Sequence, residues 1–187
     1  MKAGVLALQG DFREHAAILS GLGVVPVLVR TQEDLASVEC LAIPGGESTT
    51  MAKLARSHGL VEVIRERARS GMPVFGTCAG MILMAREVED GEHVLSILDV
   101  GVARNAYGRQ VDSFEADVEA PSISDDPLRA VFIRGPVVES VGEGVEVLAE
   151  LRGTPVLVEQ GSLLAAAFHP ELAGDDRLHR RMLERVG

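Results

Sequence analysis

A glycine-framed cysteine within residues 73–85 constrains this chain more than any other segment. The sequence PVFGTCAG ends an apolar run at Gly76, and a helix-forming segment begins after Gly80. This Gly-x-Cys-x-Gly pattern is typical of a nucleophile elbow, a strand-to-helix turn too tight for side chains beside the reactive residue. The first N–H groups of such a helix favour a thiolate and can bind an oxyanion. The pattern therefore predicts that Cys78 is a nucleophile at the carboxyl end of a strand.

The other cysteine of the chain lacks these features. Cys40 lies in an apolar strand-like run, without flanking glycines and without a following helix. Free cysteine is among the most buried residue types, so we interpret Cys40 as a core residue. Two isolated cysteines favour a reducing compartment over a disulfide framework, and we expect a cytoplasmic protein.

The first half of the chain alternates short apolar runs with helix-like segments. The expected strands cover residues 3–8, 24–29, 40–43 and 73–76. The expected helices cover residues 11–19, 33–37, 48–58, 60–70 and the segment from the elbow to about residue 86. This alternation is typical of a doubly wound α/β sheet, in which ligands bind outside the carboxyl ends of the strands. The loops 44–50 and 76–80 both follow strands, so we expect them to lie side by side.

Two local patterns refine this expectation. Asp11 and Glu14 are three residues apart and predict a capping box at the start of the first helix. Pro26 within the second strand favours an edge position, because proline cannot donate to a neighbouring strand.

The second half of the chain has the pattern of strands joined by turns. These strands are expected at residues 95–104, 112–119, 130–134, 145–151, 155–159 and 163–168, with a hairpin at Gln160-Gly161 and a last helix over 175–185. Repeats and linkers are not evident, so we expect residues 1–187 to form a single domain. The predicted fold is a three-layer α/β sandwich, with a mostly parallel central sheet and added antiparallel strands.

Charge and composition exclude several classes of function. The 18 basic and 28 acidic residues give a formal net charge of −10, which argues against nucleic acid and anionic membranes as partners. No apolar run approaches the roughly 18 residues of a membrane span. Clustered metal ligands, a phosphate-binding Gly-Lys-Ser/Thr loop and a Gly-x-Gly-x-x-Gly dinucleotide motif are absent from the sequence, so we expect neither a metal nor a cofactor.

A base for Cys78 is expected late in the chain. His169 and Glu171 flank Pro170 just after an apolar strand, whereas the other four histidines fall in expected helices or a polar turn. If Pro170 keeps the chain extended, the two side chains project to the same side. Glu171 would then orient His169, and His169 would activate Cys78. A strand-end histidine beside a solvated glutamate is the simpler interpretation of this segment alone, but Cys78 favours a triad.

The loop at residues 44–50 is open to two interpretations. As a structural element it is a strand-to-helix turn, with Ser48 as the N-cap of the next helix. As a functional element its glycines allow the bare backbone to approach a ligand. In that case Gly46 would supply an oxyanion donor opposite Ala79.

Taken together, these segments resemble class I glutamine amidotransferases, and within them the glutaminase subunits of pyridoxal 5′-phosphate synthase. The resemblance rests on residues 6–15, 44–50, 76–80, 105–110, 112–115, 132–134 and 168–171. The elbow indicates only the superfamily, whereas the opening segment and NAYGRQ at 105–110 are specific. One departure is Gly135, where we expect alanine; it does not touch the triad.

The resemblance implies hydrolysis of L-glutamine to glutamate and ammonia through a thioester on Cys78. His169 would move protons, Glu171 would orient His169, and the N–H groups of Gly46 and Ala79 would form the oxyanion hole. The implied glutamine contacts are Gly46, Glu47, Ser48, Arg104, Ile133 and Arg134. Which arginine meets the substrate carboxylate, and whether residues 133–134 act through backbone or side chains, stays open.

The resemblance also implies a protein partner. In the family, the synthase subunit receives the ammonia within a hetero-oligomer that contains many copies of each subunit. The segment 9–15 is a candidate docking surface.

Three alternatives remain at this point. The same triad would serve the glutaminase of another pathway, such as imidazole glycerol phosphate synthase. A non-catalytic regulatory subunit would not need an intact triad, and a peptidase of the same superfamily would not need the glutamine contacts.

Overall fold

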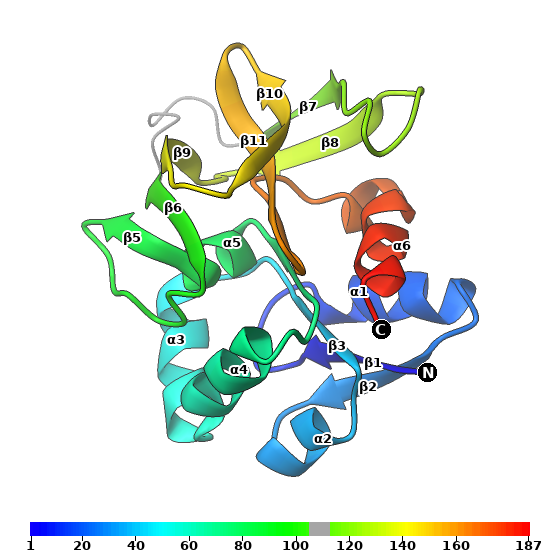
Figure 1. The fold of residues 1–187 in the computed structure, drawn as a ribbon, viewed down its shortest axis with the longest axis vertical. Coiled ribbons are helices and arrows are strands. Elements are labelled where there is room, and N and C mark those ends of the chain that lie inside the picture. The colour runs from blue at the N-terminus through cyan, green and yellow to red at the C-terminus, as the bar shows by residue number, and fades with distance from the viewer. Residues whose placement is uncertain (105–112) are drawn as a thin grey trace.

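A seven-stranded sheet forms the centre of the protein in the computed structural model, which describes residues 1–104 and 113–187 (Figure 1). The strand order is β10-β11-β12-β4-β3-β1-β2. These strands are β1 (Lys2–Leu6), β2 (Val25–Val29), β3 (Cys40–Ile43), β4 (Val74–Thr77), β10 (Glu146–Leu151), β11 (Thr154–Gln160) and β12 (Leu163–Ala166). The strands from β12 to β2 pair in parallel, and β10 and β11 extend one edge antiparallel.

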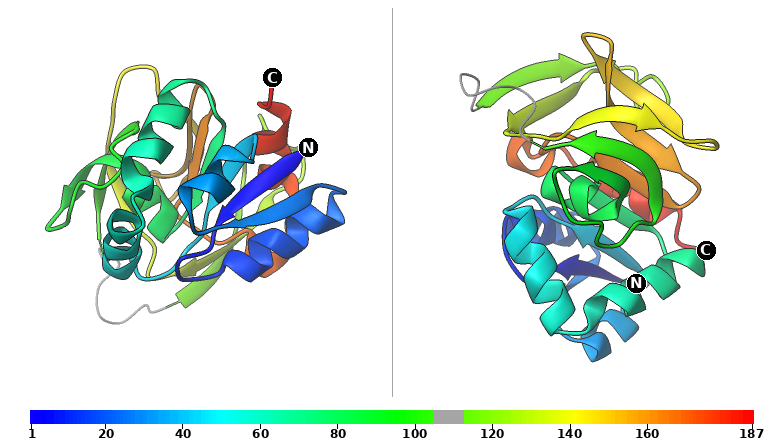
Figure 2. Two further views of the ribbon diagram at one scale, coloured as in Figure 1. Left: turned by 90° about the horizontal axis from the view of Figure 1, so that it is seen from below. Right: turned by 90° about the vertical axis from the view of Figure 1, so that its left-hand side faces the viewer.

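Helices cover both faces of this sheet, which completes a three-layer α/β sandwich (Figures 1 and 2). One layer contains α1 (Phe12–Gly21) and α6 (Arg177–Glu184), and the other contains α2 (Gln32–Ala36), α3 (Ser48–Ser57), α4 (Leu60–Arg69) and α5 (Ala79–Met84). The apolar runs of the central strands are buried on both faces, as expected for a parallel sheet between helices. The predicted fold class is therefore confirmed.

Two smaller sheets are added beside the sandwich. One contains β5 (Ala85–Glu89), β6 (Leu98–Ala103) and β9 (Val137–Val141), and the other is a hairpin of β7 (Ser113–Val118) and β8 (Leu128–Ile133). The sequence did not predict β5 and β9. The elbow helix ends at Met84, because Ala85 adopts an extended conformation with φ −57° and ψ 144° and begins β5. The prediction that this helix reaches about residue 86 is therefore wrong.

The structure also tests several local predictions made from the sequence. The edge position of the second strand is confirmed, since β2 ends the sheet. The predicted capping box at α1 is wrong, because Asp11 is the N-cap residue but its side chain makes no capping hydrogen bond. The hairpin at Gln160-Gly161 is confirmed by the antiparallel pairing of β11 and β12. The segment 105–110, which contributes to the family resemblance, lies outside the described residues.

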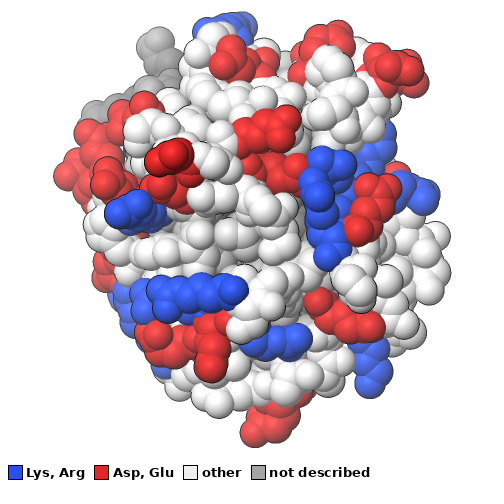
Figure 3. Space-filling model, viewed as in Figure 1, with Lys and Arg blue, Asp and Glu red and all other residues white. Residues whose placement is uncertain are grey.

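Both signs of charge occur on the face of the molecule that Figure 3 shows. Basic and acidic side chains are interspersed on the face shown in Figure 3, and the whole chain carries a net charge of −10. Within the described residues, no helix is long and apolar enough to cross a membrane.

Candidate active site

Cys78 occupies the tight turn between β4 and α5. Its backbone has φ 49° and ψ −104°, a conformation that costs a non-glycine residue about 1–3 kcal/mol. Its N–H donates to the Ala166 carbonyl oxygen at 2.8 Å, which ties the turn to the end of β12. The flanking glycines are required, because a Cβ at Gly80 would lie 2.1 Å from the Ile43 carbonyl oxygen and one at Gly76 only 2.8 Å from the backbone carbonyl carbon of Gly80. The elbow geometry predicted from the sequence is therefore present.

The sheet topology brings His169 to this turn. β12 pairs in parallel with β4, with Ala166 opposite Thr77, so the chain segments that follow both strands leave the same edge of the sheet. The backbone N–H of His169 donates to the Val131 carbonyl oxygen at 2.8 Å, which fixes the segment against β8. His169 is 3% exposed and Cys78 is 6% exposed.

Glu171 contacts His169 as expected, but by a different backbone route. His169 Nδ1 lies 2.7 Å from Glu171 Oε1, and both side chains are buried. The predicted extended chain at Pro170 is wrong, since Pro170 has helical φ −66° and ψ −29° and begins a 3₁₀ turn over Glu171–Ala173. The turn brings the carboxylate back to the imidazole, whereas extended backbone would have separated them along the chain.

The electrostatics favour a protonated His169 beside an ionised Glu171. Burial alone lowers the pKa of His169, but hydrogen bonds and charge interactions with Cys78 and Glu171 outweigh burial and raise this pKa to about 10. Burial raises the pKa of Glu171, and the imidazoles of His15 and His169 more than reverse this effect, so the pKa lies below its ordinary value. An ionised carboxylate bonded to the imidazole is the arrangement of a base and its orienting group.

A pocket of about 480 Å³ opens above Cys78. Nine of the residues singled out in the sequence line it: Gly46, Glu47, Ser48, Cys78, Ala79, Arg104, Ile133, Arg134 and His169. Glu171 is outside this lining and contacts His169 instead. The sequence analysis did not assign Gln9, Asp11, Ile82 and Leu172 to the pocket, which they also line. They come from three separate segments, the loop before α1, α5 and the 3₁₀ turn, so only the tertiary structure places them here.

The glycine loop after β3 passes directly against the histidine. A Cβ at Gly45 would lie 2.2 Å from His169 Cε1, so only glycine allows this approach. Gly46 has φ 156°, and a Cβ there would meet Gln9 Oε1 at 2.4 Å. Gln9 Oε1 accepts a hydrogen bond from the Glu47 N–H at 2.7 Å. The loop and the elbow are therefore neighbours, as predicted.

Glu47, rather than Ser48, is the N-cap of α3. Its carboxylate accepts hydrogen bonds from the N–H groups of Thr49 at 3.0 Å and Thr50 at 2.8 Å, and from the Thr50 hydroxyl. The hydroxyl and these two N–H groups lower the pKa of Glu47 to about 2. The Glu47 side chain is thus engaged by the helix, even though the residue lines the pocket.

Glu47→Ala is expected to lower the free energy of unfolding by about 1 kcal/mol, because two N–H groups of α3 lose their acceptor. The depressed pKa means that this contribution is complete above pH 4.5 and declines as the pH falls towards 2. Urea unfolding at pH 7 and pH 3 would measure both effects. Glu66→Ala, an exposed change within α4, should stay within about 0.5 kcal/mol. Equal losses for the two variants would contradict the capping role.

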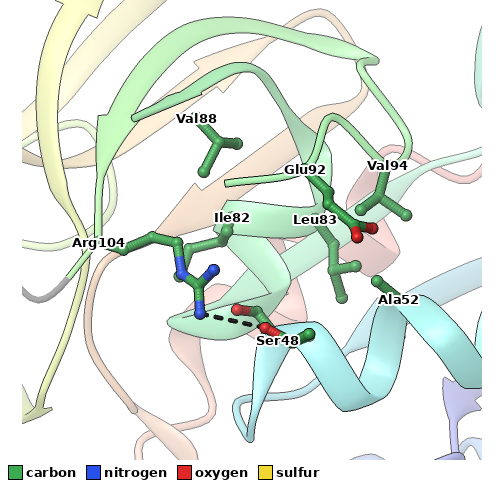
Figure 4. A pocket seen from close by; sticks show the side chains of 9 residues that line it. Ser48, Ala52, Ile82, Leu83, Val88, Glu92, Val94 and Arg104 are labelled. Atoms are coloured by element: carbon green, nitrogen blue, oxygen red, sulfur yellow. Dashed lines mark hydrogen bonds between the residues drawn. The ribbon is translucent and has the colours of Figure 1, made fainter. Parts of the chain in front are cut away.

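Arg104 and the end of β8 complete the pocket wall. The Arg104 guanidinium donates to Thr49 Oγ1 at 3.3 Å and lies 3.9 Å from Glu47 Oε1. Figure 4 shows it reaching across a smaller adjoining cavity of about 20 Å³. Cys78 Sγ lies 3.7 Å from the Ile133 carbonyl oxygen, so Ile133 faces the sulfur through its backbone.

Asp11, His169 and Glu171 bring three potential metal-ligand atoms within 4.8 Å of one another. Asp11 Oδ2 lies 3.5 Å from His169 Nδ1, which already bonds Glu171 at 2.7 Å. Because this bond occupies the nitrogen that a metal would use, we interpret the group as a hydrogen-bonded cluster.

Two histidines without a predicted role lie behind Glu171. His15 and His179 are fully buried, and His15 Nε2 lies 3.5 Å from Glu171 Oε1. Their positions on two helices, 164 residues apart, give no local pattern that connects them to the triad.

Comparisons with known proteins agree with this geometry. The model of the SNO glutamine amidotransferase family matches residues 5–186. Proteins named pyridoxal 5′-phosphate synthase subunit PdxT from Pelotomaculum thermopropionicum and Carboxydothermus hydrogenoformans are 53% and 50% identical to this chain. These alignments cover 99% and 100% of this chain and 95% and 98% of the relatives.

Solved structures share the fold. A crystal structure of a glutamine amidotransferase superposes with a TM-score of 0.94 at 50% identity, over 99% of this chain and 98% of that one. The structure of PurLQS from Thermotoga maritima has a TM-score of 0.75 at 15% identity, over 100% and 98% of the two chains. At 15% identity, the similarity to PurLQS shows only that the two proteins have the same fold.

Proposed function

Because this chain belongs to the SNO glutamine amidotransferase family, we propose that it hydrolyses the side-chain amide of L-glutamine with Cys78 as nucleophile. The observation that carries the proposal is the convergence of Cys78, His169 and the loop at Gly46 on one pocket, with Glu171 bonded to His169. The family model spans nearly all of residues 1–187, which supports a single glutaminase domain.

The reaction follows from the positions of these groups. The Cys78 sulfur attacks the amide carbon, and the carbonyl oxygen becomes an oxyanion held by the N–H groups of Gly46 and Ala79. His169 receives the thiol proton and transfers it to the leaving nitrogen, so ammonia departs and a thioester remains. His169 then removes a proton from water as it attacks the thioester, and glutamate and the free thiol are released. Glu171 stabilises the imidazolium at each stage.

The pocket walls supply partners for the charged end of glutamine. A free amino acid carries an α-carboxylate and an α-ammonium, and a site that left either group unpaired would discriminate poorly. We assign the carboxylate to Arg104 or Arg134, both in the wall, because guanidinium groups bind carboxylates through two parallel bonds. Since the Glu47 side chain is engaged as a helix cap, Glu47 and Ser48 would meet glutamine mainly through their backbone.

The product ammonia is proposed to serve pyridoxal 5′-phosphate synthesis. Relatives that match at 50–53% identity over the full chain carry the name pyridoxal 5′-phosphate synthase subunit PdxT, which favours this pathway over imidazole glycerol phosphate synthase. The chain would therefore dock on the synthase subunit in a hetero-oligomer with many copies of each. We propose a cytoplasmic location on the basis of the two unpaired cysteines.

The direct test is ammonia release from L-glutamine by this chain, with and without the synthase subunit. Release that the synthase stimulates would support the reaction and the pathway together. Release that the synthase does not change would overturn the pathway and leave the glutaminase. No release under either condition would overturn the catalytic proposal and favour a regulatory subunit.

Gln9→Ala is expected to reduce the stimulation by the synthase several-fold while the thermal midpoint of unfolding changes little. Gln9 Oε1 accepts a hydrogen bond from the Glu47 N–H at 2.7 Å. This bond connects the segment 9–15, the candidate docking surface, to the loop that would supply the oxyanion donor. The measurement is ammonia release at increasing synthase concentration. Gln32→Ala, which removes an exposed glutamine on α2, is the matched control. Unchanged stimulation in Gln9→Ala would remove this segment from the docking proposal.

A further inference from the structure

A network of buried polar side chains extends from the candidate triad into the protein interior. His15 Nε2 lies 3.5 Å from Glu171 Oε1 and 3.1 Å from Thr77 Oγ1, and His15 Nδ1 lies 2.8 Å from His179 Nε2. His15, Thr77 and His179 are each 0% exposed. This network thus connects α1, β4 and α6 to the 3₁₀ turn that contains Glu171.

We propose that His15 and His179 are positioning residues of the glutaminase: His179 fixes the tautomer of His15, and His15 donates to Thr77, whose hydroxyl donates to Glu171 and keeps its carboxylate aimed at His169. This inference rests on the proposed function, because it concerns the geometry of the same triad. It assigns a role in the reaction to two residues that lie outside the substrate pocket.

The hydrogen positions follow from the neighbouring atoms. His15 Nε2 lies 3.5 Å from an ionised carboxylate, which would repel a bare lone pair, so the nitrogen carries hydrogen and donates to Thr77 Oγ1 at 3.1 Å. The Thr77 hydroxyl then donates to Glu171 Oε1 at 3.4 Å. If Nε2 carries the only ring hydrogen, His15 is bare at Nδ1 and accepts from His179 Nε2–H at 2.8 Å. This leaves His179 Nδ1 as a lone pair, and that atom is one of two buried side-chain polar atoms without a hydrogen-bond partner among the described residues.

The reverse arrangement is less favourable. If His15 Nδ1 donated to His179, the unpaired Nδ1 of His179 would have to carry a buried hydrogen. A buried donor without an acceptor is rarer in proteins than an acceptor without a donor. Burial lowers the pKa of His179 to about 3, so His179 acts as a neutral donor near pH 7.

The donors that position the Glu171 carboxylate all approach the same one of its two oxygens. His169 Nδ1, Thr77 Oγ1 and His15 Nε2 all approach Oε1, at 2.7, 3.4 and 3.5 Å. Oε2 is buried and is the other atom without a partner among the described residues. The terminal torsion of a glutamate is broad, so the carboxylate orientation depends on the donors that reach Oε1. Without the His15 donor, the Thr77 hydroxyl could turn away from Glu171, and the carboxylate could then turn away from His169.

The test compares two substitutions at the same buried position. His15→Leu fills the space without a donor, whereas the amide N–H of His15→Gln can replace Nε2–H towards Thr77. With the synthase subunit present, we expect His15→Leu to lower kcat for glutamine hydrolysis about 10-fold, with KM within about twofold of wild type. His15→Gln should keep most of kcat, although it loses the bond to His179 and some thermal stability.

Equal kcat values for His15→Leu and His15→Gln, whether both normal or both reduced, would overturn the proposal, because packing alone would then explain the cluster. If His15→Leu does not fold, His179→Leu and His179→Gln decide in the same way, since only the amide can donate to His15.

An inactive wild type would instead mean that the proposed function fails, and this is seen before any variant is made. The downfield Nδ1 proton resonance of His169 then reports on the positioning itself. We expect the resonance in wild type and His15→Gln and its loss in His15→Leu. Its retention in His15→Leu would overturn the positioning role without reference to activity.

Discussion

Cys78→Ala should lower ammonia release from L-glutamine by at least about 10⁴-fold, to the background of the assay. Removal of the sulfur eliminates the thioester route, and the oxyanion donors of Gly46 and Ala79 are left with no attacking group to assist. Glutamine should still bind, because the pocket walls are unchanged. Kinetics with the synthase subunit, together with labelling by a glutamine-analogue alkylating reagent, measure both effects.

Cys40→Ala is the matched control, since Cys40 is the second buried cysteine and is 0% exposed in the core. Burial raises the pKa of Cys40 to about 12, so this thiol is unreactive at neutral pH. We expect Cys40→Ala to lose about 1 kcal/mol of stability and to keep its activity and labelling. Activity that persists in Cys78→Ala, or disappears in folded Cys40→Ala, would contradict the assignment of the nucleophile.

Glu171→Gln should lower kcat by about 10³- to 10⁴-fold, with a smaller change in KM. A neutral amide cannot stabilise the imidazolium of His169, and its NH₂ group can turn towards Nδ1 and favour the wrong tautomer. The carboxylate also contributes to stability. Its pKa is depressed, so this contribution is complete above the ordinary value of 4.5 and is lost as the pH falls below it. The stability difference between wild type and Glu171→Gln should therefore shrink in acid.

Asp11→Asn controls for the second carboxylate near the histidine. Asp11 Oδ2 lies 3.5 Å from His169 Nδ1, but its side chain is 38% exposed and its bond is longer than that of Glu171. We expect less than about a 10-fold loss of kcat from this change. A larger loss in Asp11→Asn than in Glu171→Gln would assign the orienting role to Asp11 instead.

Local patterns in the sequence predicted the parts of the fold that local physical chemistry decides. The strand at Cys40–Ile43 and the glycine-framed turn at Cys78 follow from short apolar runs and from steric limits that act between neighbouring residues. The prediction that depended on a single backbone angle, the extended conformation at Pro170, was wrong. Pro170 allows both extended and helical ψ, and contacts beyond the segment selected the helical one.

The sequence by itself determined the class of chemistry: one cysteine in a strand-to-helix elbow, a late His-Pro-Glu and a glycine loop at strand ends. Only the tertiary structure decided which side chains surround them. His15 and His179 lie 164 residues apart and meet because α1 and α6 cover the same face of the sheet. Hydrogen-bond partners at that separation leave no periodic pattern in the chain, because their distance is set by the packing of whole helices. The residues proposed to do the chemistry were therefore visible in the sequence, whereas those proposed to hold them in place were not.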